Sequence, residues 1–419
     1  MLNKLLLLNI GLFFIPSIYA AELNSGDTSW ILTSTALVLF MTLPGLALFY
    51  GGLVRSKNVL SVLMQCFAIA CLISVCWVVY GYSLAFKGDG LFIGNLSAAF
   101  LNGVGRDSLV GGVPETVFIS FQMTFAIITP ALVVGAFAER MKFGAMCIFS
   151  VVWFTLVYLP ACHMVWGGGY LANLGVIDFA GGLVVHATCG IGALVIALYL
   201  GQRNGFMKTP MPPHNRTMVM IGASMLWVGW FGFNGGSVLS ADPGLTSLTL
   251  VTTCLAAAAG GVVAALVSFL KFKNLDLTMF LNGILGGLVG ITAGADQMSP
   301  TDAIVIGVVA GAIIVFAVSL IDRLKLDDPV GAIAVHLVCG VWGTLAVGIF
   351  GNLASKAQFI SQLTGVVSYA IICIISSFAI IYTLKKIVGI RVSEREELEG
   401  LDAHEHGMDA YPDFRLNEH

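Results

Sequence analysis

The chain contains two matching stretches, DFAGGLVVHATCG at residues 178–190 and DPVGAIAVHLVCG at residues 328–340. Asp, Gly, Val, His, Cys and Gly occupy the same places in both stretches. Each stretch begins an apolar segment, the fifth and the tenth of those counted below. Each repeat therefore holds five segments, an odd number, so the second copy enters a membrane from the opposite side, which is the pattern of an inverted repeat. The two stretches therefore predict a membrane protein whose site lies where the copies meet, near the bilayer midplane.

The composition supports a membrane location. Hydrophobic residues make up 58% of the chain and charged residues 10%, and the mean hydropathy is +0.94, whereas soluble domains are about 25% charged. Apolar runs of about 20 residues recur, as a hydrocarbon core about 30 Å thick requires of a helix. These runs are continuous rather than alternating, which favours helices over a β-barrel. No basic patch indicates a nucleic-acid partner.

The first twenty residues are typical of a secretory signal peptide. Lys4 supplies a short basic region, residues 5–14 are apolar, and the segment ends at Ala20. The apolar run is too short to be a further membrane helix. We expect cleavage after Ala20, which leaves the mature N-terminus in the periplasm of a bacterium.

Eleven apolar segments follow and predict an all-α membrane protein with a five-plus-five inverted repeat. They cover residues 30–53, 58–84, 116–138, 144–162, 179–201, 217–238, 246–270, 278–296, 303–321, 330–351 and 360–384. With the N-terminus outside, sixteen Lys and Arg residues fall in inner loops and the tail, and only Lys87, Arg106 and Lys356 fall in outer loops. This excess follows the positive-inside rule. We therefore expect an eleven-helix domain at residues 21–388 in the inner membrane and a cytoplasmic C-terminal tail at residues 389–419.

The histidines of the two stretches, His186 and His336, form the candidate site. Each lies eight residues after an Asp that begins its helix, or about 12 Å along the axis at 1.5 Å per residue. Helices that enter from opposite faces therefore bring both imidazoles close to the middle of the core. Ionisable side chains inside a membrane are costly and usually mark a transport pathway. Their matching positions favour a pore-lining role over simple packing.

Other polar residues receive structural interpretations. Asp178 and Asp328 are expected to cap their helices, because a carboxylate satisfies free N–H groups at a helix start. His163 is either a packing residue or a residue of the outer mouth, and the remaining histidines lie in a loop or in the tail. The nine cysteines show no metal-type spacing and are expected to be packing residues. We expect no metal and no cofactor.

The motif DFAGGLVVH at residues 178–186 resembles the signature of the ammonium transporter family (Amt/Mep/Rh), and of its bacterial Amt branch in particular. Similar motifs cover nearly the whole chain: GLALFYGGLVR at 45–55, FQMTF at 121–125, GAFAER at 135–140, HMVWGGG at 163–169, GWFGFNGGS at 229–237 and DDP at 327–329. The tail from Gly400 to Tyr411 is also similar to the family's. Gly235 and Met408 depart from the commoner residues of their motifs.

The resemblance implies a homotrimer with one pore in each subunit. The residues implied are Phe125, Trp166 and Ser237, with Asp178 in a secondary role, for an outer ammonium site; Phe125 and Phe233 for a gate; and His186 and His336 for the pore beyond it. Trp230 and Asn234 are interpreted as supporting residues. The resemblance also implies a PII-type signal protein as a cytoplasmic partner that plugs the pore exit.

The implied chemistry is consistent with transport of ammonium or ammonia, or of methylammonium. An indole face binds a small cation with about 0.5–2 kcal/mol, and a hydroxyl accepts an N–H hydrogen bond. An intact cation pays at least several kcal/mol to enter a dry pore. Removing a proton from an amine with a pKa near that of lysine costs about 4 kcal/mol at pH 7, so deprotonation competes. Potassium has no proton to lose and is excluded. The order of proton return, and hence the choice between a gas channel and an electrogenic transporter, stays open.

Three alternatives remain at this point. Residues 79–82, VYGY, faintly resemble a potassium-channel filter, but they occur once and without a re-entrant loop. An intramembrane enzyme or a haem protein lacks support, because HExxH, GxSxG and CxxCH motifs are absent from the sequence, and we expect no enzyme. An ammonium sensor that signals through the tail and a PII-type partner is the main alternative function.

Overall fold

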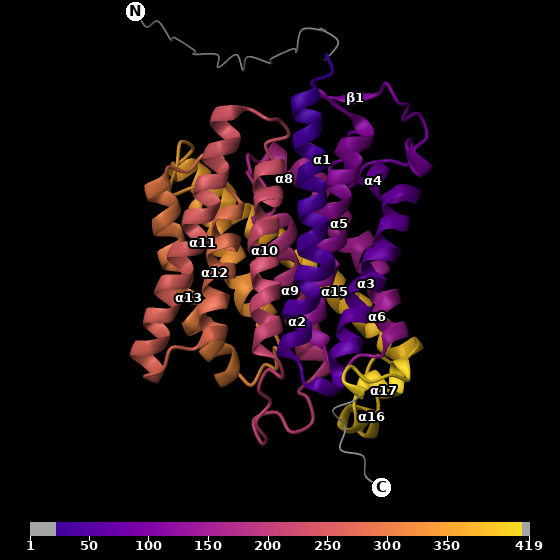
Figure 1. Cartoon of the computed structure of the whole chain (residues 1–419). Helices are drawn as coiled ribbons and strands as arrows, with labels where there is room; N and C mark the ends of the chain where they lie inside the picture. Colours follow the sequence, from indigo (N-terminus) through magenta and orange to yellow (C-terminus); the bar gives the residue numbers. More distant parts are fainter. Residues whose placement is uncertain (1–21, 413–419) are drawn as a thin grey trace, which may run out of the picture.

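The computed structural model describes residues 22–412, so the expected signal peptide lies outside the described residues. Long, roughly parallel helices form a single bundle (Figure 1). Between residues 22 and 412 the only strands are β1 (Leu109–Val110) and β2 (Val113–Pro114), which pair as a short antiparallel hairpin. The prediction of an all-helical chain is confirmed for this part of the protein.

Helices of three kinds make up most of the chain between residues 22 and 412. The α-helices are α1 (Ser25–Phe40), α2 (Ala47–Leu53), α3 (Val59–Cys76), α4 (Tyr82–Phe86), α5 (Glu115–Phe137), α6 (Phe143–Trp153), α7 (Leu159–Trp166), α8 (Tyr170–Asn173), α9 (Thr188–Leu200), α10 (Arg216–Gly236), α11 (Pro243–Phe272), α12 (Leu277–Thr292), α13 (Pro300–Arg323), α14 (Cys339–Ala346), α15 (Lys356–Ile387), α16 (Glu394–Glu399) and α17 (Leu401–His406). Five segments in this range are π-helical: Met41–Leu46, Trp77–Gly81, Phe154–Tyr158, Gly182–Ala187 and Ile333–Val338. Ser56–Asn58 and Ala99–Leu101 are 3₁₀ turns.

Nine helical stretches within residues 22–412 are long and apolar enough to cross a membrane. They are Ser25–Leu53, Ser56–Phe86, Glu115–Phe137, Phe143–Asn173, Gly182–Leu200, Arg216–Gly236, Pro243–Phe272, Pro300–Arg323 and Lys356–Ile387. Two of the expected spans correspond to the shorter apolar helices Leu277–Thr292 and Ile333–Ala346. The second of these starts late because Asp328, Pro329 and Gly331 precede the first helical turn in a non-helical conformation.

Polar caps set the starts of the long helices. Asp242 accepts from the backbone N–H of Leu245 at 2.6 Å, and Pro243 follows at the first helical position of α11. Ser299 and Asp302 form a reciprocal capping box at the start of α13. These contacts satisfy N–H groups that have no partner inside the helix. The chain therefore begins its spans where the sequence supplies a short polar side chain.

The centre of the bundle is formed by α5 and α9. Within an apolar 18-residue segment of each stretch, 89% of Glu115–Phe137 and 83% of Gly182–Leu200 is buried. By contrast, apolar side chains such as Phe316 on α13 and Ile375 on α15 are 59% and 63% exposed. Large exposed apolar surface of this kind indicates contact with lipid or with another chain.

Glycines let α11, α12 and α13 pack closely. A Cβ atom added at Gly287 of α12 would lie 2.1 Å from the carbonyl oxygen of Ala256, and one at Gly311 of α13 would lie 2.3 Å from that of Gly260. Both distances are far below van der Waals contact, so only glycine fits. Such close approach of small residues stabilises helix pairs inside a membrane.

The tail helices α16 and α17 lie at the end of the bundle opposite the β1 hairpin (Figure 1). The carboxylate of Asp402 accepts from the backbone N–H groups of Leu60 and Ser61 at 3.0 and 2.8 Å. The carboxylate of Glu397 accepts from the N–H of Asn204 at 2.6 Å. Because both acidic side chains cap backbone groups of the bundle, the tail is held against it.

Candidate functional site

The two matching stretches begin their helices in the same way. The carboxylate of Asp178 accepts four backbone N–H bonds, of 2.6–3.1 Å, from residues 181–184. Asp328 accepts from the N–H groups of Ala332 and Ile333 at 2.9 and 2.8 Å. The predicted capping role of both aspartates is confirmed. The glycine at the fourth place of each stretch has positive φ, 111° at Gly181 and 75° at Gly331, which explains why both copies carry glycine there.

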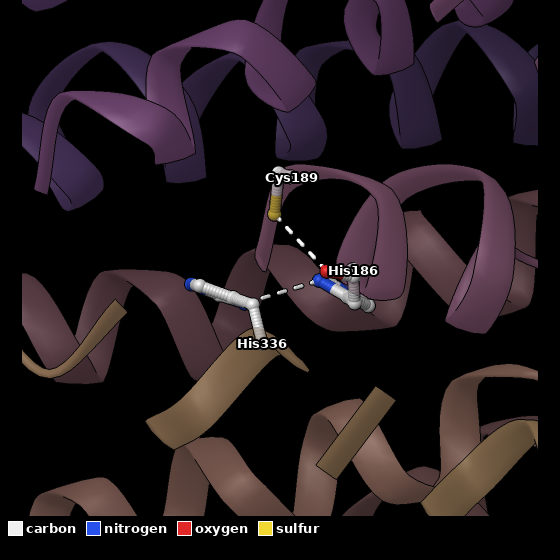
Figure 2. Close-up of side chains that lie close together, drawn as sticks. All are labelled: His186, Cys189 and His336. Carbon is white, nitrogen blue, oxygen red and sulfur yellow. Dashed lines mark hydrogen bonds between the residues drawn. The ribbon is translucent and has the colours of Figure 1, made fainter. Parts of the chain in front are cut away.

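His186 and His336 meet inside the bundle. Their Nδ1 atoms are 3.2 Å apart, and their rings lie 5.2 Å apart and nearly parallel, at 11° (Figure 2). His186 is fully buried and His336 is 6% exposed. Each lies in a π-helical segment, an irregular turn that often marks functional sites. In the short Nδ1–Nδ1 contact, one neutral ring donates and the other accepts.

Two aromatic rings stack on the His186 imidazole and hold it in place. The Trp230 ring stacks on it at 5.3 Å and 19°, and the Phe233 ring at 5.8 Å and 26°. The Trp230 indole N–H donates to the hydroxyl of Thr292 at 2.9 Å, which fixes the plane of the indole. This geometry agrees with the supporting role expected for Trp230. The Asn234 side chain donates to the Thr253 hydroxyl at 3.0 Å.

Two phenylalanines lie between the His186 ring and the Trp166 ring. The Phe125 and Phe233 rings are 4.3 Å apart and both are buried. Phe125 in turn meets the Trp166 ring edge-on at 5.7 Å and 87°. Trp166, Phe125, Phe233 and His186 therefore form one continuous series of ring contacts.

A cavity of about 320 Å³ lies on the far side of the phenylalanine pair from the histidines. It is lined by Phe86, Phe118, Gln122, Phe125, Val165, Trp166, Phe179, Ser237 and Leu239. The sequence therefore predicted three of its residues, Phe125, Trp166 and Ser237. The Ser237 hydroxyl donates to the carbonyl oxygen of Phe233 at 2.8 Å, so its oxygen keeps lone pairs for a ligand. Below, this cavity is called the outer pocket.

Asp178, the fourth predicted residue of the outer site, does not line the outer pocket. Its carboxylate is taken up by the helix cap, and its carbonyl oxygen accepts from the Trp166 indole N–H at 2.7 Å. Asp178 thus orients the indole that faces the pocket. A direct contact of its carboxylate with a cation stays a prediction.

The histidine pair borders a much smaller cavity of about 10 Å³, roughly the space of one water molecule. Its other lining residues are mostly apolar: Met41, Leu46, Phe49, Tyr50, Ile128, Leu132, Leu226, Trp230 and Leu285. Few polar groups face this space, so a hydrated ion would lose nearly all its hydrogen bonds there. The Tyr50 hydroxyl and the Trp230 N–H in this lining already donate to the Leu132 carbonyl and the Thr292 hydroxyl, so the two imidazoles are the main polar groups left for a guest.

Two motifs take the structural role expected for them. Residues 79–82 are helical, so their carbonyl groups serve the helix and cannot form a potassium filter. His163 is buried, with its ring nitrogens 2.9 and 2.5 Å from the carbonyl oxygens of Ala85 and Gly90. It therefore fixes the loop after α4, as a packing residue would.

A buried ionic cluster lies at the end of the bundle that carries the tail. Glu139 pairs with Arg55 at 2.6 Å and with Arg203 at 3.2 Å, and Asp327 pairs with Arg203 at 2.9 Å and with Arg140 at 3.4 Å. Burial by itself would raise the pKa of Glu139, but Arg203 and Arg55 bring it below its ordinary value. Arg203 and Arg140 likewise lower the pKa of Asp327 against the effect of burial. The two carboxylates are therefore held ionised.

Sequence reasoning missed two residues at this site. Gln122 lines the outer pocket, and its side-chain oxygen Oε1 is buried without a hydrogen-bond partner. The Cys189 sulfur lies beside the histidine pair (Figure 2). Cys189 follows His186 by three residues, a spacing that places both on one helix face and could have been recognised.

The family model described as Ammonium Transporter Family matches residues 29–411. The chain is 41% identical to the ammonium transporter of Bacillus subtilis over 93% of its own length and 100% of the relative's. It is 38% identical to the ammonium transporter Amt1 of Archaeoglobus fulgidus, with the same coverage.

Solved structures agree with this match. A structure titled Sensor Amt Protein aligns with a TM-score of 0.86 and 30% identity, covering 91% of this chain and 98% of that one. Mep2 of Candida albicans aligns with a TM-score of 0.84 and 33% identity, covering 90% and 88%. The chain therefore belongs to the ammonium transporter family.

Proposed function

We propose that this protein transports ammonium across the membrane, passing it as ammonia between His186 and His336. The observation that carries the proposal is the series of ring contacts that leads from the outer pocket to a buried imidazole pair. A solvated cation and a neutral molecule need different surroundings, and this path offers them in sequence. The outer pocket is lined by aromatic faces and polar groups, and the inner cavity by apolar side chains.

In the outer pocket, the face of Trp166 attracts a cation, and the oxygens of Ser237 and Gln122 accept its N–H bonds. Potassium also binds aromatic faces, so this pocket alone does not select ammonium. Selection follows at the Phe125–Phe233 gate, because the apolar space beyond it penalises every charge. Ammonium avoids that cost by giving a proton to water on the outer-pocket side of the gate, at about 4 kcal/mol at pH 7. The proton then either stays on that side or crosses separately, and the current measured in the test below distinguishes the two. Asp178 acts here by orienting Trp166.

Beyond the gate, ammonia replaces the hydrogen bond between the two imidazoles. Ammonia both donates and accepts, and so do the two neutral rings taken together. The pair can therefore hand ammonia from one nitrogen to the next without a change in net charge. Trp230 and Phe233 keep the His186 ring in the plane that this transfer needs.

The topology that fits this mechanism is eleven helices with the two matching stretches entering from opposite faces. It counts the two shorter apolar helices as spans, and the equivalent caps, glycines and π-helical segments of the two stretches support an inverted repeat. Residues 1–20 then act as a signal peptide, residues 21–388 form the inner-membrane domain, and residues 389–419 are cytoplasmic. Exposed apolar faces are available for lipid and for the partner subunits of a homotrimer.

An ammonium sensor remains the alternative, with the tail and a PII-type protein as its output. The tail contacts the bundle through Asp402 and Glu397, so a partner bound to the tail would also reach the ends of the helices. A protein titled Sensor Amt Protein shares this fold at 30% identity. A measurement of ammonium flux distinguishes the transporter from the sensor, because a sensor need not carry its ligand across the membrane.

The test is an ammonium pulse applied to proteoliposomes, with membrane current and internal pH recorded together. A current that ammonium evokes and potassium does not indicates an electrogenic transporter, and internal alkalinisation without current indicates an ammonia channel. Empty liposomes give the background. If a folded sample shows neither signal above background, transport is refuted and the sensor function takes its place. Where ammonium gives a signal, the same assay with methylammonium compares the two substrates.

A further inference from the structure

A third side chain completes a cluster at the histidine pair. Cys189 lies in the first turn of α9, and its thiol donates to the carbonyl oxygen of His186 at 3.3 Å (Figure 2). The sulfur and one nitrogen from each imidazole all lie within 4.8 Å of one another. All three residues are buried, and the Nε2 atom of His186 has no hydrogen-bond partner. The cluster of His186, Cys189 and His336 is called the thiol–imidazole cluster below.

The ligand set selects the kind of ion. Thiolate is a soft ligand that favours Cu(I) and other d¹⁰ ions, and imidazole binds the same ions. The cluster contains no carboxylate, so its only negative charge is the thiolate formed when Cys189 loses its proton. One thiolate neutralises a monovalent ion completely, whereas a divalent ion would keep a net positive charge in an apolar cavity. Because buried net charge is costly, the cluster favours a monovalent ion.

We propose that the thiol–imidazole cluster is a binding site for a soft monovalent metal ion, Cu(I), where the two matching stretches meet. Binding breaks the S–H bond of Cys189 and forms a metal–sulfur bond. The imidazole that donated from Nδ1 changes tautomer, so that its proton moves to Nε2 and both Nδ1 lone pairs are free for the ion. One proton, that of the thiol, is released in total, with no change in oxidation state. Two Nδ1 atoms 3.2 Å apart subtend about 100° at an ion bound at about 2.0–2.1 Å from each. This angle suits a three-coordinate ion. The sulfur, which lies within 4.8 Å of the nitrogens, reaches the ion by rotation about the Cα–Cβ bond of Cys189, away from the His186 carbonyl oxygen.

The second matching stretch supplies a control. Cys339 follows His336 by the same three residues and is also buried, yet it is not part of the cluster. Its sulfur instead faces α12, 3.2 Å from where a Cβ atom at Gly286 would lie. Cys189 and Cys339 therefore differ in position relative to the imidazoles, while both are buried thiols at equivalent places in the sequence.

The binding test uses the full chain, purified in detergent without oxygen and titrated with Cu(I) against bicinchoninate as a competing chelator. The competitor keeps weaker single-thiol sites unloaded. We expect the wild type and Cys339→Ala to bind one tight ion per chain and release one proton. Cys189→Ala should bind at least about tenfold more weakly. X-ray absorption at the copper edge should show one sulfur and two nitrogen ligands.

The proposal is overturned if Cys189→Ala binds as tightly as the wild type, if Cys339→Ala weakens binding equally, or if the spectrum shows sulfur ligands alone. Cys189→Ser keeps the size and the hydrogen bond to the His186 carbonyl but removes the soft ligand. If gel filtration shows that Cys189→Ala does not fold, Cys189→Ser therefore tests in its place whether the sulfur binds the ion.

A bound ion would also block the path, and this consequence rests on the proposed function. In the proteoliposome assay, Cu(I) should reduce the ammonium signal of the wild type and of Cys339→Ala, but not that of Cys189→Ser. The two ideas fail separately. Tight copper binding without any ammonium signal refutes transport and keeps the metal site, and ammonium flux without tight binding refutes the metal site.

Discussion

Gly190→Ala should damage the histidine site without touching either imidazole. A Cβ atom at Gly190 would lie 2.3 Å from the backbone nitrogen of Leu337 and 2.5 Å from its Cα atom. Ordinary contact begins at 3.4 Å, so the backbones have to separate by about 1 Å. Leu337 follows His336 in the same π-helical segment, and the His186–His336 contact of 3.2 Å would open beyond hydrogen-bond range.

The energetic cost of this substitution follows from the same distances. Overpacking against backbone cannot be relieved by a rotamer change, so we take the upper end of the usual range, about 3 kcal/mol. Alanine returns about 1 kcal/mol through its better helix propensity. The net loss of about 2 kcal/mol is a factor of about 30 in the folding equilibrium.

Titration with sodium dodecyl sulfate in mixed micelles unfolds the protein and measures this loss of stability. The proteoliposome assay measures transport. Gly144→Ala is the control, because no atom lies within 4 Å of its added Cβ. We expect Gly190→Ala to lose both stability and flux, and Gly144→Ala to keep both. A Gly190→Ala protein with the stability and flux of the wild type would refute the packing on which the histidine geometry rests.

Three further predictions follow from the charged and aromatic groups. Glu139→Gln should cost about 3–5 kcal/mol of unfolding free energy, because it leaves the buried Arg203 and the partly buried Arg55 with less compensation; denaturant unfolding measures this. Since the pKa values of Glu139 and Asp327 are lowered in the folded protein, their stabilisation is complete above about pH 5 and is lost as the pH falls below about 4. Thermal unfolding between pH 3 and 7 checks the trend, and a flat profile contradicts it. Trp166→Leu should raise the half-saturating ammonium concentration about 2- to 30-fold, through the loss of about 0.5–2 kcal/mol of cation–π energy.

The long-range placement of the histidines could be predicted from the sequence. Matching stretches imply equivalent depth, and the structure brings His186 and His336 into contact. The helix caps Asp178 and Asp328 were predictable for the same reason, because capping is decided within a few residues. Such features depend on local spacing or on repetition, and both are visible in one chain.

Other features depend on contacts that spacing does not reveal. Glu139, Arg140 and Asp327 stood in recognised motifs, but their joint burial with Arg203 needs the folded bundle. The same holds for Gln122, whose unpaired oxygen has meaning only beside the outer pocket. The π-helical segments also escaped prediction, since a single added residue in a turn leaves no mark in the hydrophobic pattern.

The most direct test of the histidine pathway is the ammonium signal of His186→Ala and His336→Ala in proteoliposomes, with the wild type and Gly144→Ala measured beside them. Each histidine variant should lose the ammonium-evoked current or alkalinisation, because ammonia would then cross the apolar cavity without the paired imidazoles. The control should retain the wild-type signal. Folded histidine variants that carry ammonium at the wild-type rate would contradict the proposal that the pair passes the substrate.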